Sequence, residues 1–164
     1  MSKHKDFVFS ILINMLKDPM DAQEATQDTF VKVFRRIHSY SDQSKFTTWL
    51  YSIAYRTGLD YLKKRKKTLS LDDKEMHIQA TFHNQNPEVI LESKDRKKRI
   101  LELISTLTPE EAAVIRMFYF KELSLKEIAE ITHLSLANVK VKLYRARQSI
   151  KTHLKSSLTH LSDA

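Results

Sequence analysis

The side chains of Asn138 and Arg145 lie about two helical turns apart in a stretch that is rich in Lys and Arg. Amide and guanidinium groups form paired hydrogen bonds with the edges of DNA bases, whereas ammonium groups suit phosphates. The apolar residues around them recur at helical spacing and define one buried stripe: Val139, Leu143, Ala146 and Ile150. The opposite arc carries Ala137, Asn138, Val141, Tyr144, Arg145 and Gln148. This pattern predicts a helix that presents base-reading groups on its exposed side, as a major-groove helix does.

A second short helix is predicted just before this one. Ser124 and Glu127 have the spacing of a capping box, and Ser135 is a candidate N-cap for the helix that follows. The three-residue turn between the helices gives the layout of a helix-turn-helix unit. His133 stands in the turn, where many such units have Gly, and His tolerates a positive φ better than most residues.

Cations flank the exposed arc at Lys140, Lys142 and Arg147, and no Asp or Glu occurs from Ser135 to Lys155. The alternative is an ordinary surface helix with solvated lysines.

Composition restricts the fold and the class of partner. The chain has 164 residues with only one Gly and three Pro, which favours an all-α protein over a sheet protein. Its net charge of +8 favours a polyanionic partner, first nucleic acid and second an anionic membrane surface. There is no Cys, which fits a reducing cytosol, and no apolar run is long enough to span a bilayer.

The first half of the sequence predicts two helices before a polar loop. Residues 7–16 have helical spacing, Asp18-Pro19 interrupts the pattern, and Asp21 is the candidate cap of the next helix. The outer face of that next helix carries Glu24, Gln27, Asp28 and Arg35. Either these groups are simply solvated, with the acids near the positive end of the helix dipole, or they form a docking face for a protein partner.

Residues 45–67 predict a third helix that mixes aromatic residues with cations. We expect Phe46, Leu50, Ile53, Thr57 and Tyr61 to face inward. The predicted outer surface carries Trp49, Tyr51, Tyr55, Arg56, Lys63 and Lys64. Aromatic rings next to cations can stack on unpaired bases while the cations hold phosphates, although such rings are often core residues instead.

Residues 68–92 lose periodicity and become net acidic, so we expect a linker between domains 1–67 and 93–160. With such a linker, the expected arrangement is two flexibly separated domains. Residues 94–107 are again helical in pattern, and Thr108-Pro109-Glu110-Glu111 is a strong helix start. The sequence shows no catalytic constellation, metal-ligand spacing or phosphate-binding Gly loop, so no enzyme activity or cofactor is predicted.

Taken together, three segments resemble the bacterial extracytoplasmic-function (ECF) sigma factors, group 4 of the sigma-70 family of RNA polymerase specificity subunits. Residues 18–37 are similar to the segment that docks the polymerase clamp, residues 46–67 to the segment that melts and reads the minus-ten element, and residues 107–151 to the minus-thirty-five reader. The three segments stand in the family's order.

The resemblance implies a role for each set of residues. Polymerase-binding residues would be Asp21, Glu24, Gln27, Asp28, Phe30 and Arg35. Minus-ten contacts would be Lys45, Phe46, Trp49, Ser52, Tyr55, Arg56, Lys63, Lys64 and Arg65, with the loop 39–45 as a pocket for a flipped base. Minus-thirty-five contacts would be Ser135, Ala137, Asn138, Lys140, Val141, Lys142, Tyr144 and Arg145.

The resemblance also implies partners. These are core RNA polymerase, through its beta-prime clamp and beta flap, promoter DNA in double-stranded and melted form, and a cognate anti-sigma factor, with no small-molecule ligand. The protein would be cytoplasmic, where an anti-sigma factor can sequester it at the membrane. Rival interpretations are an autonomous dimeric regulator, a basic RNA-binding or membrane-surface protein and, least favoured, a nucleotide-dependent enzyme.

Overall fold

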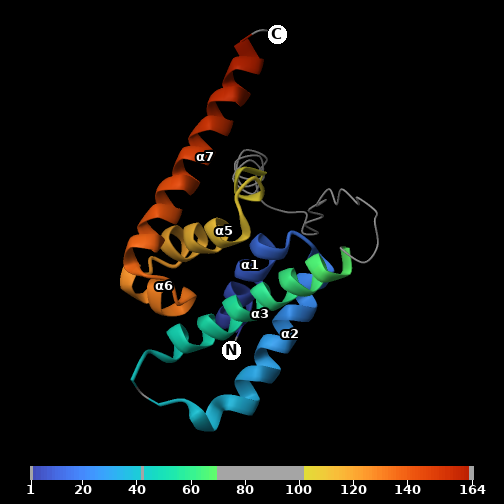
Figure 1. Ribbon diagram of the computed structural model, residues 1–164, viewed down its shortest axis with the longest axis vertical. Helices are drawn as coiled ribbons and strands as arrows, with labels where there is room; N and C mark the ends of the chain where they lie inside the picture. Colours follow the sequence, from blue (N-terminus) through green and yellow to red (C-terminus); the bar gives the residue numbers. More distant parts are fainter. Residues whose placement is uncertain (1, 42, 70–101, 163–164) are drawn as a thin grey trace.

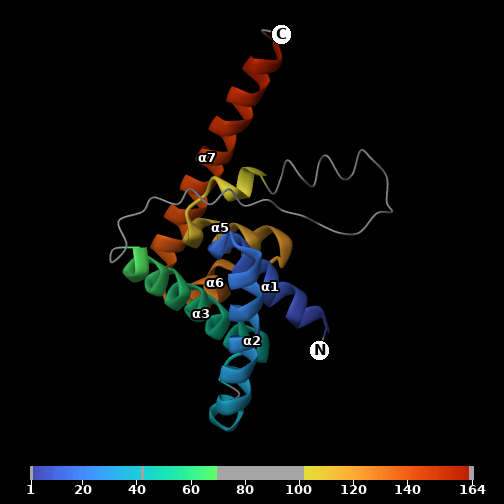
Figure 2. The ribbon, with the colours of Figure 1, turned by 90° about the vertical axis from the view of Figure 1, so that its right-hand side faces the viewer.

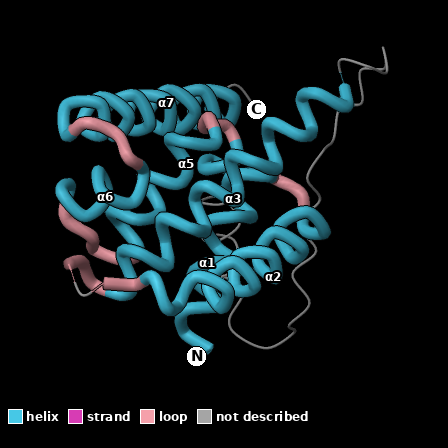
Figure 3. Tube along the Cα trace, turned by 60° about the horizontal axis from the view of Figure 1, so that its bottom comes forward, coloured by secondary structure: helices cyan, strands magenta, loops and turns pink. Residues whose placement is uncertain are grey.

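The structure is a computed structural model that describes residues 2–41, 43–69 and 102–162. The elements are α1 (Ser2–Leu16), α2 (Pro19–Arg36), η1 (Ile37–Ser39), α3 (Phe46–Leu69), α5 (Pro109–Ile115), η2 (Arg116–Phe120), α6 (Leu125–Thr132) and α7 (Leu136–Ser162). Figure 3 shows helix along nearly all of the described chain, which contains no strand. The predicted all-α fold is confirmed.

The helices of the second half begin where local side-chain chemistry supplies their caps. At the start of α5, Thr108 accepts a hydrogen bond from the Glu111 backbone and Glu111 accepts one from the Thr108 backbone. Ser124 and Glu127 form the same reciprocal pair at the start of α6. Each capping box satisfies backbone N–H groups that have no partner within the helix. Both capping predictions are confirmed.

The predicted cap of α2 is wrong by one helical turn. The helix begins at Pro19, and the Asp18 side chain accepts a hydrogen bond of 2.9 Å from the Asp21 backbone. Proline is favourable in the first turn because it has no N–H to lose and its φ is already helical. Asp21 therefore lies inside the first turn, where its charge still complements the helix dipole.

Helix α3 is packed on more than the one side that its predicted stripe indicated. Leu50, Ile53 and Thr57 are buried as expected, but Tyr51 and Tyr55 are also buried, at 2% and 1% exposure. The Tyr51 ring meets the edge of Phe7 on α1 at 4.7 Å between centroids. The prediction that Tyr51 and Tyr55 lie on the surface is thus wrong, because α3 has a second apolar stripe that other helices cover.

Both ends of α3 also differ from the prediction, the first in its exposure and the last in its position. Phe46, predicted to face inward, is 37% exposed because it is the first residue of α3 and lies at the end of the helix. Thr68 and Leu69, assigned to the linker, extend the helix. The rest of the predicted linker, residues 70–92, and most of the predicted helix 94–107 lie outside the described residues.

The helix-turn-helix half packs directly on the first half, which differs from the flexible separation we expected. In Figures 1 and 2, α5 lies beside α1, and α6 lies beside the first turns of α3. Buried residues of α1, α3, α5 and α6 form one continuous core. Helix α7 leaves this body, and its C-terminal end projects away from the other elements (Figure 1).

Candidate nucleic-acid interface

The exposed arc of α7 has the geometry that the sequence predicted. Val139, Leu143 and Ala146 are buried against the body. Each residue of the predicted arc is exposed: Ala137, Asn138, Val141, Tyr144, Arg145 and Gln148. The Ser135 hydroxyl accepts a hydrogen bond of 3.2 Å from the Asn138 backbone, as expected of an N-cap. The amide and guanidinium groups suited to base edges therefore face solvent on one rigid helix.

The turn before α7 uses His133 in place of the usual Gly. His133 adopts the left-handed conformation with φ 55° and ψ 28°, so the departure from Gly does not prevent the turn. Its ring Nε2 accepts a hydrogen bond from the Arg56 guanidinium at 2.8 Å. Burial, and then the positive charge of Arg56, lowers the pKa of His133. The turn is therefore held against α3 by the residue that fixes its backbone.

Lys142, which we predicted to contact DNA, has a partner within the C-terminal half. Lys142 forms a close ion pair with Glu110 of α5, and its side chain is only 23% exposed. Lys140, by contrast, is exposed on the edge of the arc. Lys142 therefore braces α7 against α5 in this structure, and Lys140 is the cation free to approach a phosphate.

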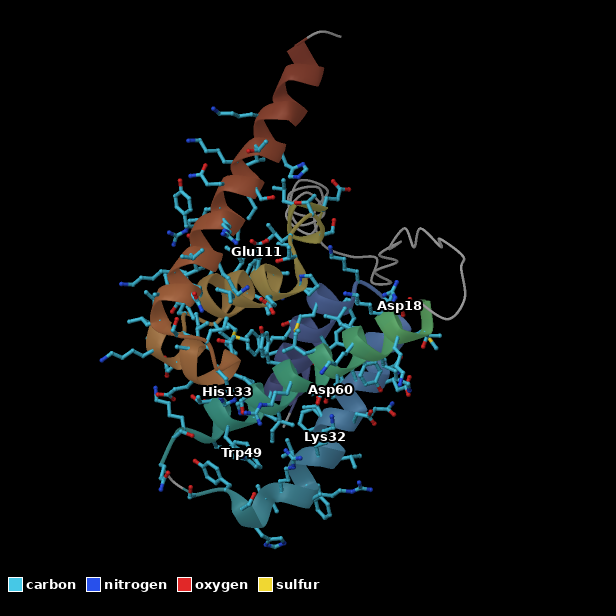
Figure 4. The ribbon with its side chains drawn as sticks, in the orientation of Figure 1. Asp18, Lys32, Trp49, Asp60, Glu111 and His133 are labelled. Atoms are coloured by element: carbon cyan, nitrogen blue, oxygen red, sulfur yellow. The ribbon has the colours of Figure 1, made fainter. Side chains whose placement is uncertain are left out.

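At the N-terminal end of α3, three aromatic rings pack together beside the loop that precedes the helix. Tyr40, Phe46 and Trp49 have centroids 5.3–5.8 Å apart. The Tyr40 hydroxyl donates a hydrogen bond of 2.7 Å to the Ser44 carbonyl, which folds the loop onto the cluster. Figure 4 shows Trp49 at this end of the molecule. Tyr40 was not among the predicted site residues, although it stood within the predicted loop pocket.

The remaining predicted minus-ten residues fall into three groups. Lys63 and Lys64 are exposed on the last turns of α3. Ser52 and Arg65 are half-buried and donate to carbonyls, Ser52 to Trp49 and Arg65 to Leu16 at the end of α1. In the third group, Lys45 forms an ion pair of 2.8 Å with Glu127 of α6, Arg56 hydrogen-bonds to His133, and Tyr55 is buried.

A basic cleft of about 700 Å³ lies between α2 and α3. Its lining includes two predicted residues, Arg56 and Lys63, and three cations that the sequence analysis missed: Lys32, Arg36 and Lys66. The Lys32 ammonium donates to the Thr57 hydroxyl at 3.1 Å and to the Asp60 carboxylate at 3.4 Å. Figure 4 shows Lys32 and Asp60 facing each other across the cleft. A cleft with five cations and one acid favours a polyanion such as a DNA strand.

The missed cations could have been predicted by considering the cations of α2 together with those of α3. Lys32 and Arg36 lie one turn apart on α2, beside residues of α3 that line the same cleft. We had assigned only the face with Glu24, Gln27, Asp28 and Arg35 to a partner, and Lys32 lies one turn after Asp28 at the edge of that face. The signal for the cleft was therefore the pair Lys32 and Arg36 on α2, next to α3, the helix that carries Arg56.

The outer face of α2 is free, as the predicted docking face requires. Glu24, Gln27, Asp28 and Arg35 are exposed, whereas Asp21 is half-buried. The Tyr61 hydroxyl donates a hydrogen bond of 2.8 Å to the Asp28 carboxylate. Phe30 packs partly against the core, because it lies on the inner side of the helix, so little of it is available to a partner.

Two apolar residues on α2 were not predicted and extend its exposed face. Phe34 is 81% exposed and Val31 is 48% exposed. Neighbouring exposed apolar and charged side chains on one helix are typical of a protein-binding surface.

Within residues 4–41, 43–68 and 102–155, no three His, Asp or Glu side chains approach closely enough to hold a metal ion. The described helices include none that is long and apolar enough to cross a membrane.

Two family models match the chain in the order of its two halves. Residues 1–68 match Sigma-70 region 2, and residues 97–150 match a model of Sigma-70 region 4. The ECF RNA polymerase sigma factor SigM of Bacillus subtilis strain 168 is 35% identical over 146 residues, 88% of this chain and 86% of SigM. SigW of the same organism is 29% identical over 159 residues, 93% of this chain and 85% of SigW. The chain therefore belongs to the ECF RNA polymerase sigma factors.

Solved structures share the fold across both halves. The sigma factor RpoE of Bartonella quintana, in complex with the anti-sigma factor NepR, superposes with a TM-score of 0.76 at 18% identity, over 93% of this chain and 92% of RpoE. CnrH, in complex with the cytosolic domain of CnrY, gives a TM-score of 0.64 at 17% identity, over 94% and 84%. These identities establish similarity of fold.

Proposed function

We propose that this chain binds core RNA polymerase and directs promoter-specific initiation of DNA-templated transcription. The observation that carries the proposal is the pairing of two different DNA-binding surfaces in one ECF sigma chain. One is the exposed base-reading arc of α7. The other is the aromatic and basic surface formed by α3, its preceding loop and the cleft against α2.

Each surface has a distinct role. Asn138 and Arg145 on α7 read base edges of the upstream, minus-thirty-five element in the major groove. The cluster of Tyr40, Phe46 and Trp49 captures an unpaired base of the minus-ten element, which offsets the few kcal/mol that unstacking costs. Arg56 and the cleft cations hold the phosphates of the strand that leads to this cluster.

The outer face of α2 is the polymerase-docking surface. Glu24, Gln27, Asp28 and Arg35 supply its polar groups, and Val31 and Phe34 supply an apolar patch. Its partner is the beta-prime clamp, while the helix-turn-helix half engages the beta flap. The functional units are then residues 1–67 and 93–160, joined by a linker at 68–92.

Regulation by an anti-sigma factor is part of the proposal. One structural relative, RpoE, was solved with the anti-sigma factor NepR. The chain would act in the cytoplasm, where such a partner can hold it silent at the membrane and release it under envelope or other stress. The polymerase makes the RNA, so the chain itself catalyses no reaction.

The test is transcription in vitro with purified core polymerase on a pool of promoter fragments, with and without this protein. Asp28→Lys reverses a charge on the docking face, and Arg145→Ala removes a base-reading group. Because Asp28 also accepts the Tyr61 hydroxyl, Tyr61→Phe is the matched control that loses this hydrogen bond and keeps the charge.

We expect specific transcripts that depend on the protein. Asp28→Lys should lower polymerase binding and every transcript, while Tyr61→Phe should retain both. Arg145→Ala should retain polymerase binding and lower transcription from its cognate promoters by about tenfold, the cost of one lost base contact. Tight sequence-specific DNA binding without polymerase, together with no transcripts, would instead establish an autonomous regulator.

A further inference from the structure

An ion pair within the C-terminal half holds one lysine of the base-reading helix against the protein. Lys142 of α7 pairs closely with Glu110 in the first turn of α5, and the Lys142 side chain is only 23% exposed. Because no Asp or Glu occurs from Ser135 to Lys155, a carboxylate for this lysine has to come from another element. Helices α5 and α7 pack against each other (Figure 1), and the ion pair is part of that packing.

This ion pair lies next to the two groups that we assign to base reading. Lys142 follows Asn138 by four positions and precedes Arg145 by three, so the three side chains are neighbours on one side of α7. At the other edge of the buried stripe, the Arg147 guanidinium donates a hydrogen bond of 2.8 Å to the Tyr119 hydroxyl of η2. Polar contacts therefore fix the orientation of α7 on both sides of its buried stripe.

The ion pair changes what Lys142 can contribute to DNA binding. Cations of a protein bind DNA of any sequence by neutralising phosphates and releasing the counterions that the phosphates held. A lysine that is already neutralised by a carboxylate adds little to this effect, and it must leave Glu110 before it can approach a phosphate. Lys140 is exposed and is under no such constraint. The two lysines that we predicted to contact DNA therefore have different roles in this structure.

We infer that Glu110 sets the sequence discrimination of α7 through Lys142. Glu110 withholds Lys142 from phosphates, and the pair is a positioning contact for Asn138 and Arg145. A freed lysine would strengthen binding to every sequence. A fixed helix orientation favours only the complex whose base edges match. Both effects of the pair raise the ratio of cognate to mixed-sequence affinity. This inference rests on the proposed function for the identity of the cognate DNA, whereas the state of Lys142 can be tested without it.

The chain offers a matched pair of variants at adjacent positions of α5. Glu110→Gln removes the charge that holds Lys142 and keeps the size of the side chain. Glu111→Gln is the control, because Glu111 pairs with Thr108 at the start of α5 (Figure 4) and Gln can also close a capping box. Each variant loses one negative charge. A difference between them therefore does not come from net charge.

A second matched pair compares the two lysines of α7. Lys142→Met and Lys140→Met each lose one positive charge and keep an unbranched apolar stem. Lys140 is exposed, whereas Lys142 is mostly covered by its contact with α5. If the two lysines have different roles, these variants should differ in how their DNA affinity depends on salt. Circular dichroism of each variant checks that the helices are intact.

The first measurement is the affinity of the full chain for a duplex of mixed sequence over a series of salt concentrations, without polymerase. On logarithmic axes, each lost phosphate contact should reduce the salt slope by about 0.9. Lys140→Met should show this reduction, and Lys142→Met should keep the slope of the parent chain. Compared with Glu111→Gln, Glu110→Gln should steepen the slope by about 0.9 and bind about three- to tenfold more tightly at low salt. Adding Lys142→Met to Glu110→Gln should abolish this gain.

Three results of the salt series would overturn the inference. A slope that falls as much in Lys142→Met as in Lys140→Met would make Lys142 an ordinary phosphate contact. Equal slopes and affinities for Glu110→Gln and Glu111→Gln would mean that Glu110 does not withhold the lysine. A gain that persists in the double variant would come from the lost repulsion between Glu110 and DNA, and not from release of Lys142.

The second measurement is discrimination by the complex with core polymerase, on a promoter obtained from the transcription assay and on the mixed-sequence duplex. The ratio of the two affinities should fall about three- to tenfold in Glu110→Gln and be retained in Glu111→Gln. An unchanged ratio in Glu110→Gln would overturn the role in discrimination. Absence of promoter-specific transcripts with the parent chain would instead contradict the proposed function, and the salt series distinguishes the two failures.

Discussion

At the scale of single residues, some side chains both stabilise their own turn or helix and contact the other half of the chain. His133 closes the helix-turn-helix turn in a left-handed conformation and also accepts the Arg56 guanidinium. Glu127 caps α6 and also binds Lys45. The hydrogen bond from Lys45, followed by the one from the Ser124 backbone, lowers the pKa of Glu127 to about 2. The contacts that fasten the two halves are therefore built from residues that local structure already holds in place.

The contact between His133 and Arg56 predicts that the closed form of the chain, in which the helix-turn-helix half packs on the first half, depends on pH. Packing lowers the pKa of His133 below its ordinary value of 6.5, so the open chain binds the proton more tightly than the closed chain. Closure is then fully supported above this value and is weakened as pH falls below it. Glu127 stays ionised throughout, and its ion pair with Lys45 persists. The sequence has no Cys, so Gln43→Cys and Lys126→Cys, both exposed and one in each half, can carry spin labels. The distance between these labels should report more opening at pH 5 than at pH 8.

His133→Gly is the control for this pH dependence, because it removes the titrating ring and keeps the turn. Its distance distribution should not change between pH 5 and pH 8. If the variant opened on acidification as much as the parent chain, another group would be responsible for the pH response.

At the scale of helices, the sequence predicted well where helices begin. It predicted poorly which sides of a helix are buried by other helices. The caps at Thr108 and Ser124 were predictable because each depends on residues three positions apart. The burial of Tyr51 and Tyr55 was not predictable, because the spacing of apolar residues within one helix does not show how many of its sides pack against other helices. The clustering of Tyr40 with Phe46 and Trp49 likewise depends on how the loop folds back onto α3.

Gly58 tests the packing of α3 on α1. A Cβ at this position would lie 3.0 Å from the end of the Met15 side chain and 3.2 Å from Leu12. Gly58→Val should lower the free energy of unfolding by about 1–3 kcal/mol through overpacking. Gly58→Ala should be nearly neutral, because a gain in helix propensity of about 1 kcal/mol offsets a small shift of the flexible Met15 end.

Urea denaturation of both Gly58 variants measures these changes. A Val variant as stable as the parent chain would show that α1 and α3 do not approach as closely as the structure has them. An Ala variant as unstable as the Val variant would show that Met15 cannot move aside.

At the scale of the whole molecule, the order of the two functional halves was predictable and their arrangement was not. The base-reading arc of α7 and the acidic face of α2 each belong to one helix, so one segment of sequence contains the whole pattern. The junction is different. Lys17 meets the carbonyl of Leu107, and Arg56 meets His133, across 90 and 77 positions of sequence. No local pattern distinguishes such contacts from solvated side chains.

In the arrangement of the structure, two cations of the predicted minus-ten surface have partners in the other half, whereas the base-reading arc of α7 is exposed. A charge of +8 by itself would favour non-specific binding to any nucleic acid. Lys45 pairs with Glu127 and Arg56 with His133, so both cations already have a partner within the chain although their side chains remain exposed. Polymerase, by binding α2 and the helix-turn-helix half at separate places, would supply the free energy that separates them.

The most direct test of this account is the distance between labels at positions 43 and 126 before and after addition of core RNA polymerase. We predict a single short distance in the free chain and a longer one in the complex, with Asp28→Lys retaining the short distance because it does not dock. A short distance that persists in a chain bound to polymerase would contradict the account, as would a free chain that shows no short distance.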